Sequence, residues 1–453
     1  MSAFLKYYKF MMFKREELIE ATGAQCLKND CWDLEEFKIS TDTRTIAKGD
    51  IYLPLKGANF DGEKFIEQAL SSGAIGYFTT SDTVFDNAKL VLKVDDTKEA
   101  YLNLAKFYRF KINPKTVMIT GSSGKTTTKE IVYSVLSQKF KTQKTFSNHN
   151  NEIGFCQTVL GMPSDTQALV VEAGMRGLGE IELISKHLEP DFAIITNSGT
   201  AHIGRLGSLD NIAEAKCEIA SGLNENGAFI ALNQEIIKKH LKYNGKKIFY
   251  SLKDVKVLER KVGYSKFEYK NNIYELNVEG DYNIENSLAA IESGYCLGLN
   301  YEEIFQGLKS YKPIEKRWEV ENVGGINFIN DSYNANPDSM KASVKTFVEL
   351  YDKPVVVLGN MGELGENEVQ YHKEVGLYLS ELKKDVKYFV VGNLAAEIGK
   401  VLEQNGFEVK YFDNNEQAAN EIVKICSNGE TVFLKASRSM EFEKIIENIR
   451  GKI

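Results

Sequence analysis

Several residue types are scarce in this sequence of 453 residues. Proline occurs 7 times and cysteine 6 times, and no two cysteines form a Cys-x-x-Cys pair. Scattered cysteines in a long chain exclude a disulfide framework and a zinc site of the Cys-x-x-Cys kind. Reduced thiols are typical of the cytosol, so we expect a cytoplasmic protein.

Long apolar runs and an excess of positive charge are absent too. No stretch reaches about 18 consecutive apolar residues, so no membrane span is expected. Residues 1–14 are interrupted by Lys6 and Lys9 and lack the apolar core of a signal peptide. The chain holds 56 basic and 63 acidic residues without a long basic run, so nucleic acid is not an expected partner.

The composition predicts well-packed domains. Hydrophobic residues make up 43% of the chain, and its length predicts about two to four domains. Helix and strand patterns alternate along most of the sequence, which favours α/β architecture with parallel sheets. We expect three domains: a smaller α/β domain at 1–97, a central domain with a phosphate-loop-type parallel sheet at 98–312, and a Rossmann-like domain at 313–453.

Apolar runs and helical periodicity give the expected elements. Strands are expected at 74–79, 90–94, 116–120, 168–172, 192–196, 326–330, 355–358, 388–391 and 431–434. Helices are expected at 65–72, 97–111, from 126 to about 140, at 211–223, at 283–297 and from about 337 onward. Ligands of open parallel sheets bind at the carboxyl ends of the strands, so residues at those ends are the candidates for chemistry.

A glycine-rich turn follows the strand at 116–120 and opens the next helix. Its residues are Gly121, Ser122, Ser123, Gly124, Lys125, Thr126 and Thr127. Glycines allow close approach of the backbone to phosphate oxygens, the lysine reaches the terminal phosphates, and a hydroxyl can ligate Mg²⁺. The loop is two residues shorter between its glycines than the common Walker pattern. The alternative is a chance glycine-rich turn.

Two further strand ends carry candidate groups. Glu172 ends the apolar strand at 168–172, where a carboxylate can coordinate Mg²⁺ or polarise water. The alternative is a strand-end charge that faces solvent. His202 follows the strand at 192–196, and a single histidine is more often structural than a ligand.

Lys216 lies on an apolar face of the helix expected at 211–223, beside Ala213, Ala215 and Ile219. A charged lysine on such a face is costly, so either the side chain reaches solvent or it loses its charge. A neutral amine can add CO₂ to give a carbamate, an anion that can ligate Mg²⁺. The pattern alone favours the solvent-reaching side chain.

The segment from Asn330 to Pro337 ends a strand and starts a helix. Asp331, Asn334 and Asn336 make it dense in hydrogen-bonding side chains. It is either a polar ligand loop or an extended helix cap. Its length and its place at a strand end favour the ligand loop.

These motifs resemble the Mur ligase family over nearly the whole chain from about residue 38. The matching segments are 40–44, 59–62, 120–130, 148–154, 172–175, 201–204, 212–219, 283–290, 316–317, 331–340, 359–365 and 435–440. The 331–340 segment is similar to that of members that add D-alanyl-D-alanine. The Asp-Asn-Pro-Arg motif of members that add the third peptide residue is not found.

The resemblance implies an ATP-dependent amide ligase with a UDP-binding first domain. Its implied substrates are ATP, UDP-N-acetylmuramoyl-tripeptide and D-alanyl-D-alanine. The implied enzyme is a monomer that joins the tripeptide to the dipeptide through an acyl phosphate. It further implies two Mg²⁺ ions and a carbamate on Lys216. Three positions depart from the family pattern: Glu63, Cys156 and Asn360.

The resemblance also implies a role for each candidate residue. Catalytic roles fall to Lys125, Glu172, His202 and Lys216, and metal ligation to Thr126, Glu172, His202 and Lys216. ATP binding falls to Gly121, Ser122, Ser123, Gly124, Lys125, Thr126, Thr127, Asn286, Arg317 and Asp331. Substrate binding falls to Ser40, Asp42, Arg44, Asn150, Asn151, Asn334, Asn336, Lys435, Ser437 and Arg438.

Two other functions compete with this interpretation. A ligase of the folylpolyglutamate synthase type would share the ATP machinery, but such ligases lack the UDP-binding segment at 40–44. A nucleotide-dependent switch would hydrolyse ATP slowly and alone. The separate first domain and the 331–340 segment argue against a switch.

Overall fold

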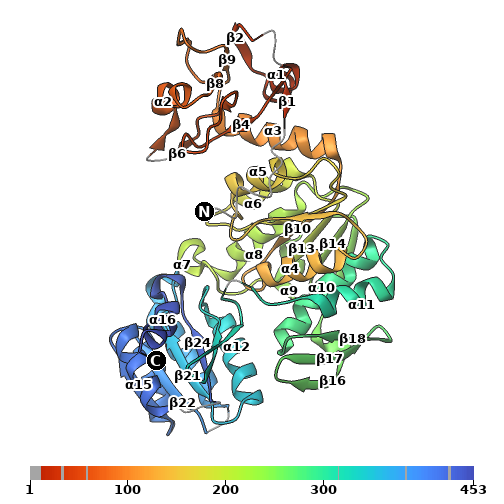
Figure 1. Ribbon diagram of the computed structural model, residues 1–453. Helices are drawn as coiled ribbons and strands as arrows, with labels where there is room; N and C mark the ends of the chain where they lie inside the picture. The colour runs from red at the N-terminus through yellow and green to blue at the C-terminus, as the bar shows by residue number, and fades with distance from the viewer. Residues whose placement is uncertain are drawn as a thin grey trace.

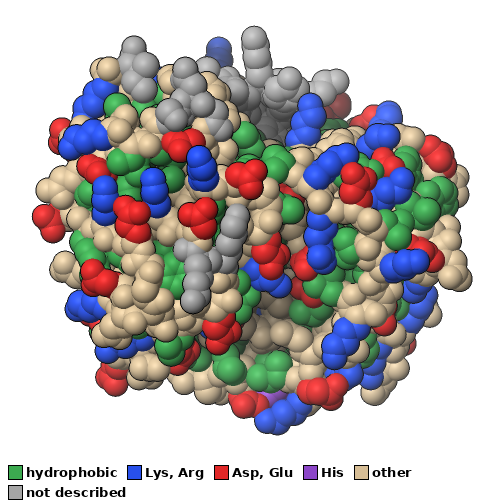
Figure 2. Space-filling view, turned by 90° about the horizontal axis from the view of Figure 1, so that it is seen from below, with side chains coloured by type: hydrophobic (Ala, Val, Ile, Leu, Met, Phe, Trp, Pro, Cys, Tyr) green, Lys and Arg blue, Asp and Glu red, His purple; other side chains and the backbone are tan. Residues whose placement is uncertain are grey.

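The computed structural model describes residues 12–31, 35–57, 60–314, 316–382, 385–426 and 430–452. Three α/β bodies follow one another in space, with the N-terminal one at the top of Figure 1 and the C-terminal one at the lower left. In these residues no helix is long and apolar enough to cross a membrane. Acidic, basic and hydrophobic side chains are interspersed on the face seen in Figure 2.

The N-terminal body is built on a five-stranded sheet with the order β2-β9-β8-β5-β4. Adjacent strands in this sheet pair in parallel, except that β2 and β9 pair antiparallel. Its strands are β1 (Phe13–Lys14), β2 (Gln25–Asn29), β3 (Glu36–Phe37), β4 (Ile39–Ser40), β5 (Ile51–Tyr52), β6 (Lys56–Gly57), β7 (Phe60–Asp61), β8 (Gly76–Thr79) and β9 (Leu90–Lys93). Its helices are α1 (Arg15–Thr22) and α2 (Ile66–Ser71).

Helix α3 (Thr97–Ile112) joins this body to the next one, as Figure 1 shows. Asp96 caps it by accepting hydrogen bonds from the Lys98 and Glu99 amides. Tyr101 and Tyr108 are buried on its apolar face, and the helix packs against α1, α5 and α6. The amphipathic helix expected at 97–111 is therefore confirmed.

The central body contains a six-stranded, fully parallel sheet with the order β11-β12-β10-β13-β14-β15. Its strands are β10 (Lys115–Thr120), β11 (Thr142–Lys144), β12 (Ala168–Glu172), β13 (Phe192–Ile195), β14 (Ala228–Leu232) and β15 (Lys246–Tyr250). Along β10, Met118 packs into one core cluster while Val117 and Ile119 pack into another. The apolar run is continuous because both faces of the sheet are covered.

Helices cover both faces of this sheet. They are α4 (Lys125–Leu136), α5 (Glu152–Leu160), α6 (Glu180–Leu188), α7 (Ile203–Leu206), α8 (Leu209–Cys217), α9 (Glu235–His240), α10 (Asp281–Cys296) and α11 (Tyr301–Ser310). A three-stranded antiparallel sheet, β16 (Val255–Lys261), β17 (Tyr264–Tyr269) and β18 (Asn272–Leu276), lies beside them.

The C-terminal body contains a six-stranded sheet with the order β19-β20-β24-β21-β22-β23, in which only β19 is antiparallel. Its strands are β19 (Glu319–Val323), β20 (Ile326–Asn330), β21 (Val355–Gly359), β22 (Lys387–Val391), β23 (Glu408–Phe412) and β24 (Thr431–Lys435). Its helices are α12 (Pro337–Leu350), α13 (Glu368–Ser380), α14 (Ala395–Gln404), α15 (Asn415–Ile425) and α16 (Glu443–Arg450). The expected multi-domain α/β class is confirmed, whereas the boundaries at 97/98 and 312/313 stay a prediction.

Two expected helices are shorter in the structure. The helix expected to reach about Phe140 ends at Leu136, because the chain turns there to enter β11 at Thr142. The helix expected at 211–223 ends at Cys217 and tightens into the 3₁₀ turn η3 (Glu218–Ala220). The Glu218 carboxylate there accepts a hydrogen bond from the Gly179 amide.

Candidate functional site

A cavity of about 1050 Å³ lies between the carboxyl edge of the central sheet and the C-terminal body. The sequence candidates that line it are Ser122, Ser123, Gly124, Lys125, Thr126, Thr127, Asn150, Asn151, Glu172, His202, Asn286, Arg317, Asp331, Asn334, Asn336 and Lys435. They come from segments more than 300 residues apart in the chain. The strand ends therefore meet at one site, as the sheet rule predicts.

The phosphate loop leaves no room for side chains at its two glycines. A Cβ on Gly121 would lie 1.8 Å from Thr196 Oγ1, and one on Gly124 would lie 2.5 Å from Asn286 Oδ1. Gly124 also has a φ of 78°, a conformation that L-residues rarely adopt. These constraints explain why glycine stands at both positions.

The residues after β13 fix the shape of the phosphate loop. Asn197 Oδ1 accepts a hydrogen bond from the Ser123 amide at 3.0 Å, and Thr196 Oγ1 donates to the Ser123 carbonyl at 2.6 Å. Ser122 Oγ donates to the Gly199 carbonyl and accepts from the Gly199 amide. The loop is thus held by side chains before any ligand binds.

Glu172 lies at the centre of the polar contacts beside the loop. Its carboxylate accepts hydrogen bonds from Thr126 Oγ1 at 2.9 Å and from Asn150 Nδ2 at 3.0 Å. Lys129 Nζ, which is fully buried, lies 3.5 Å from the same carboxylate and 3.3 Å from Glu130. The alternative of a solvent-facing strand-end charge is wrong, because Glu172 is 2% exposed.

Burial and charge act in opposite directions on these groups. Burial acts to raise the pKa of Glu172, but the charges of Lys129, Arg317 and Lys125 outweigh it and hold the pKa below its ordinary value. Burial lowers the pKa of Lys125, with a further lowering from Arg317 and an opposing effect from Glu172. Glu172 therefore remains a carboxylate that can bind a cation at neutral pH.

Lys216 is 1% exposed, so its side chain does not reach solvent as the pattern alone favoured. Burial, followed by repulsion from Lys125, moves the pKa of Lys216 well below its ordinary value. Among the described residues its amine makes no hydrogen bond or ion pair and does not line the cavity. Carbamate formation needs an unprotonated amine, and the lowered pKa of Lys216 favours that form.

His202 is held by the C-terminal body. Its Nδ1 lies 2.6 Å from Glu363 Oε2, and its backbone has a φ of 65°. The close contact with His202 holds the pKa of Glu363 below its ordinary value, although burial acts to raise it. His202 therefore lies at the cavity, but a carboxylate of another domain already contacts it.

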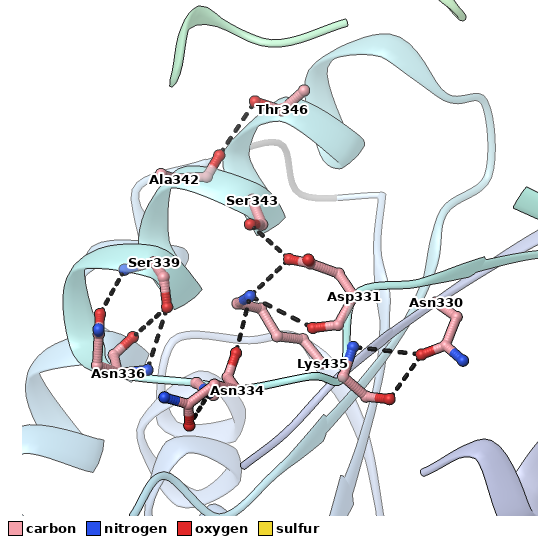
Figure 3. A network of polar contacts seen from close by, with 11 residues as sticks. Asn330, Asp331, Asn334, Asn336, Ser339, Ala342, Ser343, Thr346 and Lys435 are labelled. Atoms are coloured by element: carbon pink, nitrogen blue, oxygen red, sulfur yellow. Dashed lines mark hydrogen bonds and ion pairs between the residues drawn. The ribbon is translucent and has the colours of Figure 1, made fainter. Parts of the chain in front are cut away.

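Asp331 and Lys435 form the main polar network of the C-terminal side, drawn in Figure 3. Lys435 Nζ lies 2.5 Å from Asp331 Oδ2 and also donates to the Asn334 carbonyl. Ser343 Oγ donates to the same Asp331 oxygen at 2.8 Å. Because Lys435 is buried and paired, it fixes the 331–334 segment at the cavity wall.

The segment before α12 serves as both a helix cap and a cavity wall. Asn336 Oδ1 accepts a hydrogen bond from the Ser339 amide at 2.9 Å, and Pro337 occupies the first helical turn (Figure 3). Asn334 is exposed at the cavity. The two interpretations of this segment are therefore compatible.

Arg317 lies flat on an aromatic ring. Its guanidinium carbon is 3.9 Å from the centroid of the Tyr333 ring, and both residues line the cavity. Arg317 Nε is buried and has no hydrogen-bond partner in the described part of the chain. A phosphate or ribose oxygen could accept the hydrogen bond that this N–H donates.

Besides Gly121 and Lys216, which do not line the cavity either, five candidates lie away from the cavity lining. They are Ser40, Asp42, Arg44, Ser437 and Arg438. Asp42 and Arg44 pair with each other at 2.6 Å, and Arg438 pairs with Glu443 at 2.5 Å. Asn59, from the 59–62 segment, and residues 1–11 lie outside the described residues.

The departures from the family pattern have structural explanations at two positions. Asn360 Oδ1 accepts a hydrogen bond from the Ala395 amide at the start of α14. Glu63 accepts hydrogen bonds from the Thr80 amide and hydroxyl and lies 3.2 Å from Lys56. Both residues therefore fix loops instead of facing the cavity.

Sequence reasoning assigned no role to Lys129, Glu285, Asp338 and Glu363. Lys129 is a lysine on the buried face of α4, so the apolar pattern around it was the available signal. The other three are charged residues in polar contexts and give no such signal. Only their position at the cavity reveals them.

The donors at the loop fit Mg²⁺. Thr126 and Glu172 offer hard oxygen ligands beside the phosphate loop, and Mg²⁺ commonly binds through one or two protein oxygens plus phosphates and water. No group of three or more His, Cys, Asp or Glu that could hold a metal occurs in the residues that the structure describes. The protein alone therefore offers a partial site that a nucleotide's phosphates would complete.

The fold and the site define an α/β protein of the nucleotide-binding class, with its cavity between the central and C-terminal bodies. Family models match by description as "Mur ligase family, catalytic domain" at 38–109, "Mur ligase middle domain" at 119–294 and "Mur ligase, glutamate ligase domain" at 316–438. The chain belongs to the Mur ligase family.

Individual relatives match nearly end to end. The UDP-N-acetylmuramoyl-tripeptide–D-alanyl-D-alanine ligase of Bacillus subtilis is 36% identical, over 91% of this chain and 92% of its own length. A crystal structure of MurF from Acinetobacter baumannii has a TM-score of 0.85 at 29% identity and covers 98% of this chain and 99% of its own. The MurF ligase of Thermotoga maritima in complex with ADP has a TM-score of 0.81 at 26% identity, with 91% and 97% covered.

Proposed function

We propose that this chain is an ATP-dependent ligase that joins D-alanyl-D-alanine to the terminal carboxylate of UDP-N-acetylmuramoyl-tripeptide in peptidoglycan precursor synthesis. The observation that carries the proposal is the likeness, along nearly the whole chain, to ligases of that name. The cavity between the phosphate loop and the C-terminal body supports it, because that cavity has room for a nucleotide and a second substrate.

The reaction proceeds in two steps. The tripeptide carboxylate attacks the γ-phosphorus of ATP, an acyl phosphate forms and ADP leaves. The dipeptide amine then attacks the acyl carbon, loses a proton, and phosphate leaves as the amide forms. Phosphoryl transfer depends mainly on positioning and charge neutralisation, which the Lys125 ammonium and the loop amides supply.

Each domain has a part in this scheme. The phosphate loop and Asn286 hold the triphosphate and the base side of ATP, while Arg317 and Asp331 reach it from the C-terminal body. Ser40, Asp42 and Arg44 bind the UDP end of the tripeptide substrate, more remote from the chemistry. Asn150, Asn151, Asn334, Asn336, Lys435, Ser437 and Arg438 hold the peptide portions directly or through the loops they fix.

Mg²⁺ belongs to the same proposal. Thr126 and Glu172 would hold one ion, while His202 and a carbamate on Lys216 would hold a second. Bound Mg²⁺ would neutralise phosphate charge during transfer. The hydrogen bond between Thr126 Oγ1 and Glu172 keeps these two oxygen ligands together in its absence.

The function is tested by measuring ADP release with ATP, D-alanyl-D-alanine and UDP-N-acetylmuramoyl-tripeptides that carry lysine or diaminopimelate. We expect rapid release only when both peptide substrates are present. Hydroxylamine added without the dipeptide should trap an acyl hydroxamate. Release that is independent of the peptides would identify a switch, and release with folate and glutamate would identify the other ligase type.

The carbamate on Lys216 has a separate test. Lys216→Ala should lower kcat about 100-fold or more, because a ligand of the reaction's cation is lost. Acetate or formate should restore part of the activity by replacing the missing carboxylate. Lys125→Ala, which removes the phosphate-loop lysine, should abolish turnover and serves as the reference. A Lys216→Ala variant as active as the wild type would contradict the carbamate, and so would an inactive one that no added carboxylate rescues.

A further inference from the structure

The loop at residues 197–202, which follows β13, is contacted by the C-terminal body at two points. This segment, here called the bridging loop, carries His202 and runs into α7. Figure 1 shows α7 at the junction of the two bodies. The contacts come from Asp338 in the first turn of α12 and from Glu363 in the turn that precedes η5 (Gly365–Asn367).

The first contact is made by the Asp338 carboxylate. Its Oδ2 accepts hydrogen bonds from the Thr200 amide at 2.8 Å and from Thr200 Oγ1 at 2.9 Å. A Cβ on Gly199 would lie 2.3 Å from the same oxygen. The loop is therefore shaped to admit this carboxylate, and only glycine at position 199 leaves space for it.

The second contact involves both backbone and side chains. The Glu363 carbonyl accepts a hydrogen bond from the Gly204 amide at 3.0 Å, and its carboxylate lies 2.6 Å from His202 Nδ1. A Cβ on Gly204 would lie 2.3 Å from the Gly365 nitrogen, so the two backbones touch. His202 and Glu363 have φ values of 65° and 61°, a strained conformation for side-chain-bearing residues.

The opposite side of the bridging loop contacts the phosphate loop. Ser122 Oγ exchanges hydrogen bonds with the Gly199 amide and carbonyl, at 2.8 and 3.1 Å. Asn197 holds the Ser123 amide at 3.0 Å. Gly199 is thus fixed by Ser122 on one side and contacted by Asp338 on the other.

We propose that Asp338 and Glu363 are positioning residues that transmit docking of the C-terminal body through the bridging loop to the phosphate loop. Docking then sets both the Ser122–Ser123 turn and the orientation of His202. Strain at His202 and Glu363 persists because the contact holds both backbones. The role in catalysis rests on the ligase function proposed above, whereas the mechanical coupling does not.

The coupling predicts a particular kinetic pattern. The loop amides and Asn286 bind ATP without Asp338, so the ground-state affinity should change little. Phosphoryl transfer needs the docked geometry, so Asp338→Ala, which removes both hydrogen bonds to Thr200, should lower kcat about tenfold. The KM for ATP should stay within about twofold of the wild-type value.

A double-mutant cycle tests whether the effect passes through Thr200. Asp338→Ala, Thr200→Val and the double variant are compared by kcat and by ADP affinity. We expect the double variant to be no slower than Asp338→Ala alone, because Asp338→Ala already removes the hydroxyl hydrogen bond that Thr200→Val removes. Asp338→Asn should recover part of the rate, since its amide oxygen can still accept a hydrogen bond. Losses that multiply in the double variant would overturn the proposal.

Small-angle X-ray scattering of the substrate-free protein gives a readout that needs no activity. Asp338→Ala combined with Gly204→Ala should increase the radius of gyration, because both contacts are removed. Asp165→Ala is the matched control, an exposed aspartate paired with Lys141 away from the junction. A scattering curve identical to that of the wild type would overturn the coupling even if the ligase assay itself fails.

Discussion

Glu285 is an acidic side chain that lines the cavity from α10 without a hydrogen bond or ion pair in the described part of the chain. Burial, with a smaller contribution from the charge of Asp281, raises the pKa of Glu285 from 4.5 to about 7. The protonated form is therefore the one that the folded state favours. The mechanism proposed above gives this residue no part.

The raised pKa predicts a pH dependence of stability. The folded state holds the Glu285 proton up to about pH 7 and the unfolded state only up to about 4.5, so folding loses stability as pH rises between these values. Glu285→Gln should remove this loss and raise the free energy of unfolding at pH 8 by on the order of 2 kcal/mol. Thermal unfolding of the wild type and of Glu285→Gln at pH 5 and pH 8 measures this difference in stability.

The control for this prediction is Glu225→Gln, an exposed residue remote from the cavity. That variant should follow the wild type at both pH values. An equal Tm for wild type and Glu285→Gln at pH 8 would show that the carboxyl ionises freely in the fold.

At the scale of elements, the turn from β10 into α4 depends on contact with α10. Gly124 has a left-handed backbone and lies so close to Asn286 on α10 that an added side chain would clash. The phosphate loop therefore packs directly against α10. Asn286 is buried and cannot move freely away from a new side chain. The start of α4 and the proposed nucleotide site thus depend on the same contact.

Gly124→Ala should weaken ADP binding about tenfold or more and destabilise the fold by about 1–2 kcal/mol, because it adds both backbone strain and a clash. Gly179→Ala is the matched control, since Gly179 has a φ of 84° but nothing within 4 Å of an added Cβ. Its stability should fall by the strain alone, with ADP affinity unchanged. Calorimetric titration that finds equal ADP affinities for the two variants would contradict the role of the Asn286 contact.

The elements themselves were largely predictable from the sequence. Strands β12 and β20 coincide with the expected ranges, and α12 begins at Pro337 as expected. Apolar runs and caps are local signals, read within a few residues of each position. The end of α4 and the 3₁₀ turn after α8 were missed because contacts with β11 and α6 decide them.

At the scale of the whole molecule, the site exists only where separate bodies meet. Thr126 on α4 and Glu172 at the end of β12 belong to the central body, whereas Arg317, Asp331 and Lys435 belong to the C-terminal body. The bridging loop is one contact between these bodies, and the hydrogen bond from the Tyr351 hydroxyl to Glu279 is another. The coupling experiment above tests the first of them. The N-terminal body lies beyond α3, at the end of the molecule away from the C-terminal body (Figure 1).

The sequence by itself determined the α/β class and the glycine-rich turn between β10 and α4, because hydrophobic period, glycine and proline act over a few residues. It also determined Glu172 and Asp331 as strand-end candidates, since parallel strands end at a common edge. Only the tertiary structure decided that Lys216 is buried without a partner, that Arg438 pairs with Glu443 outside the cavity and that Asp338 reaches Thr200. Such contacts join residues across domains, and no local pattern records which surfaces will meet.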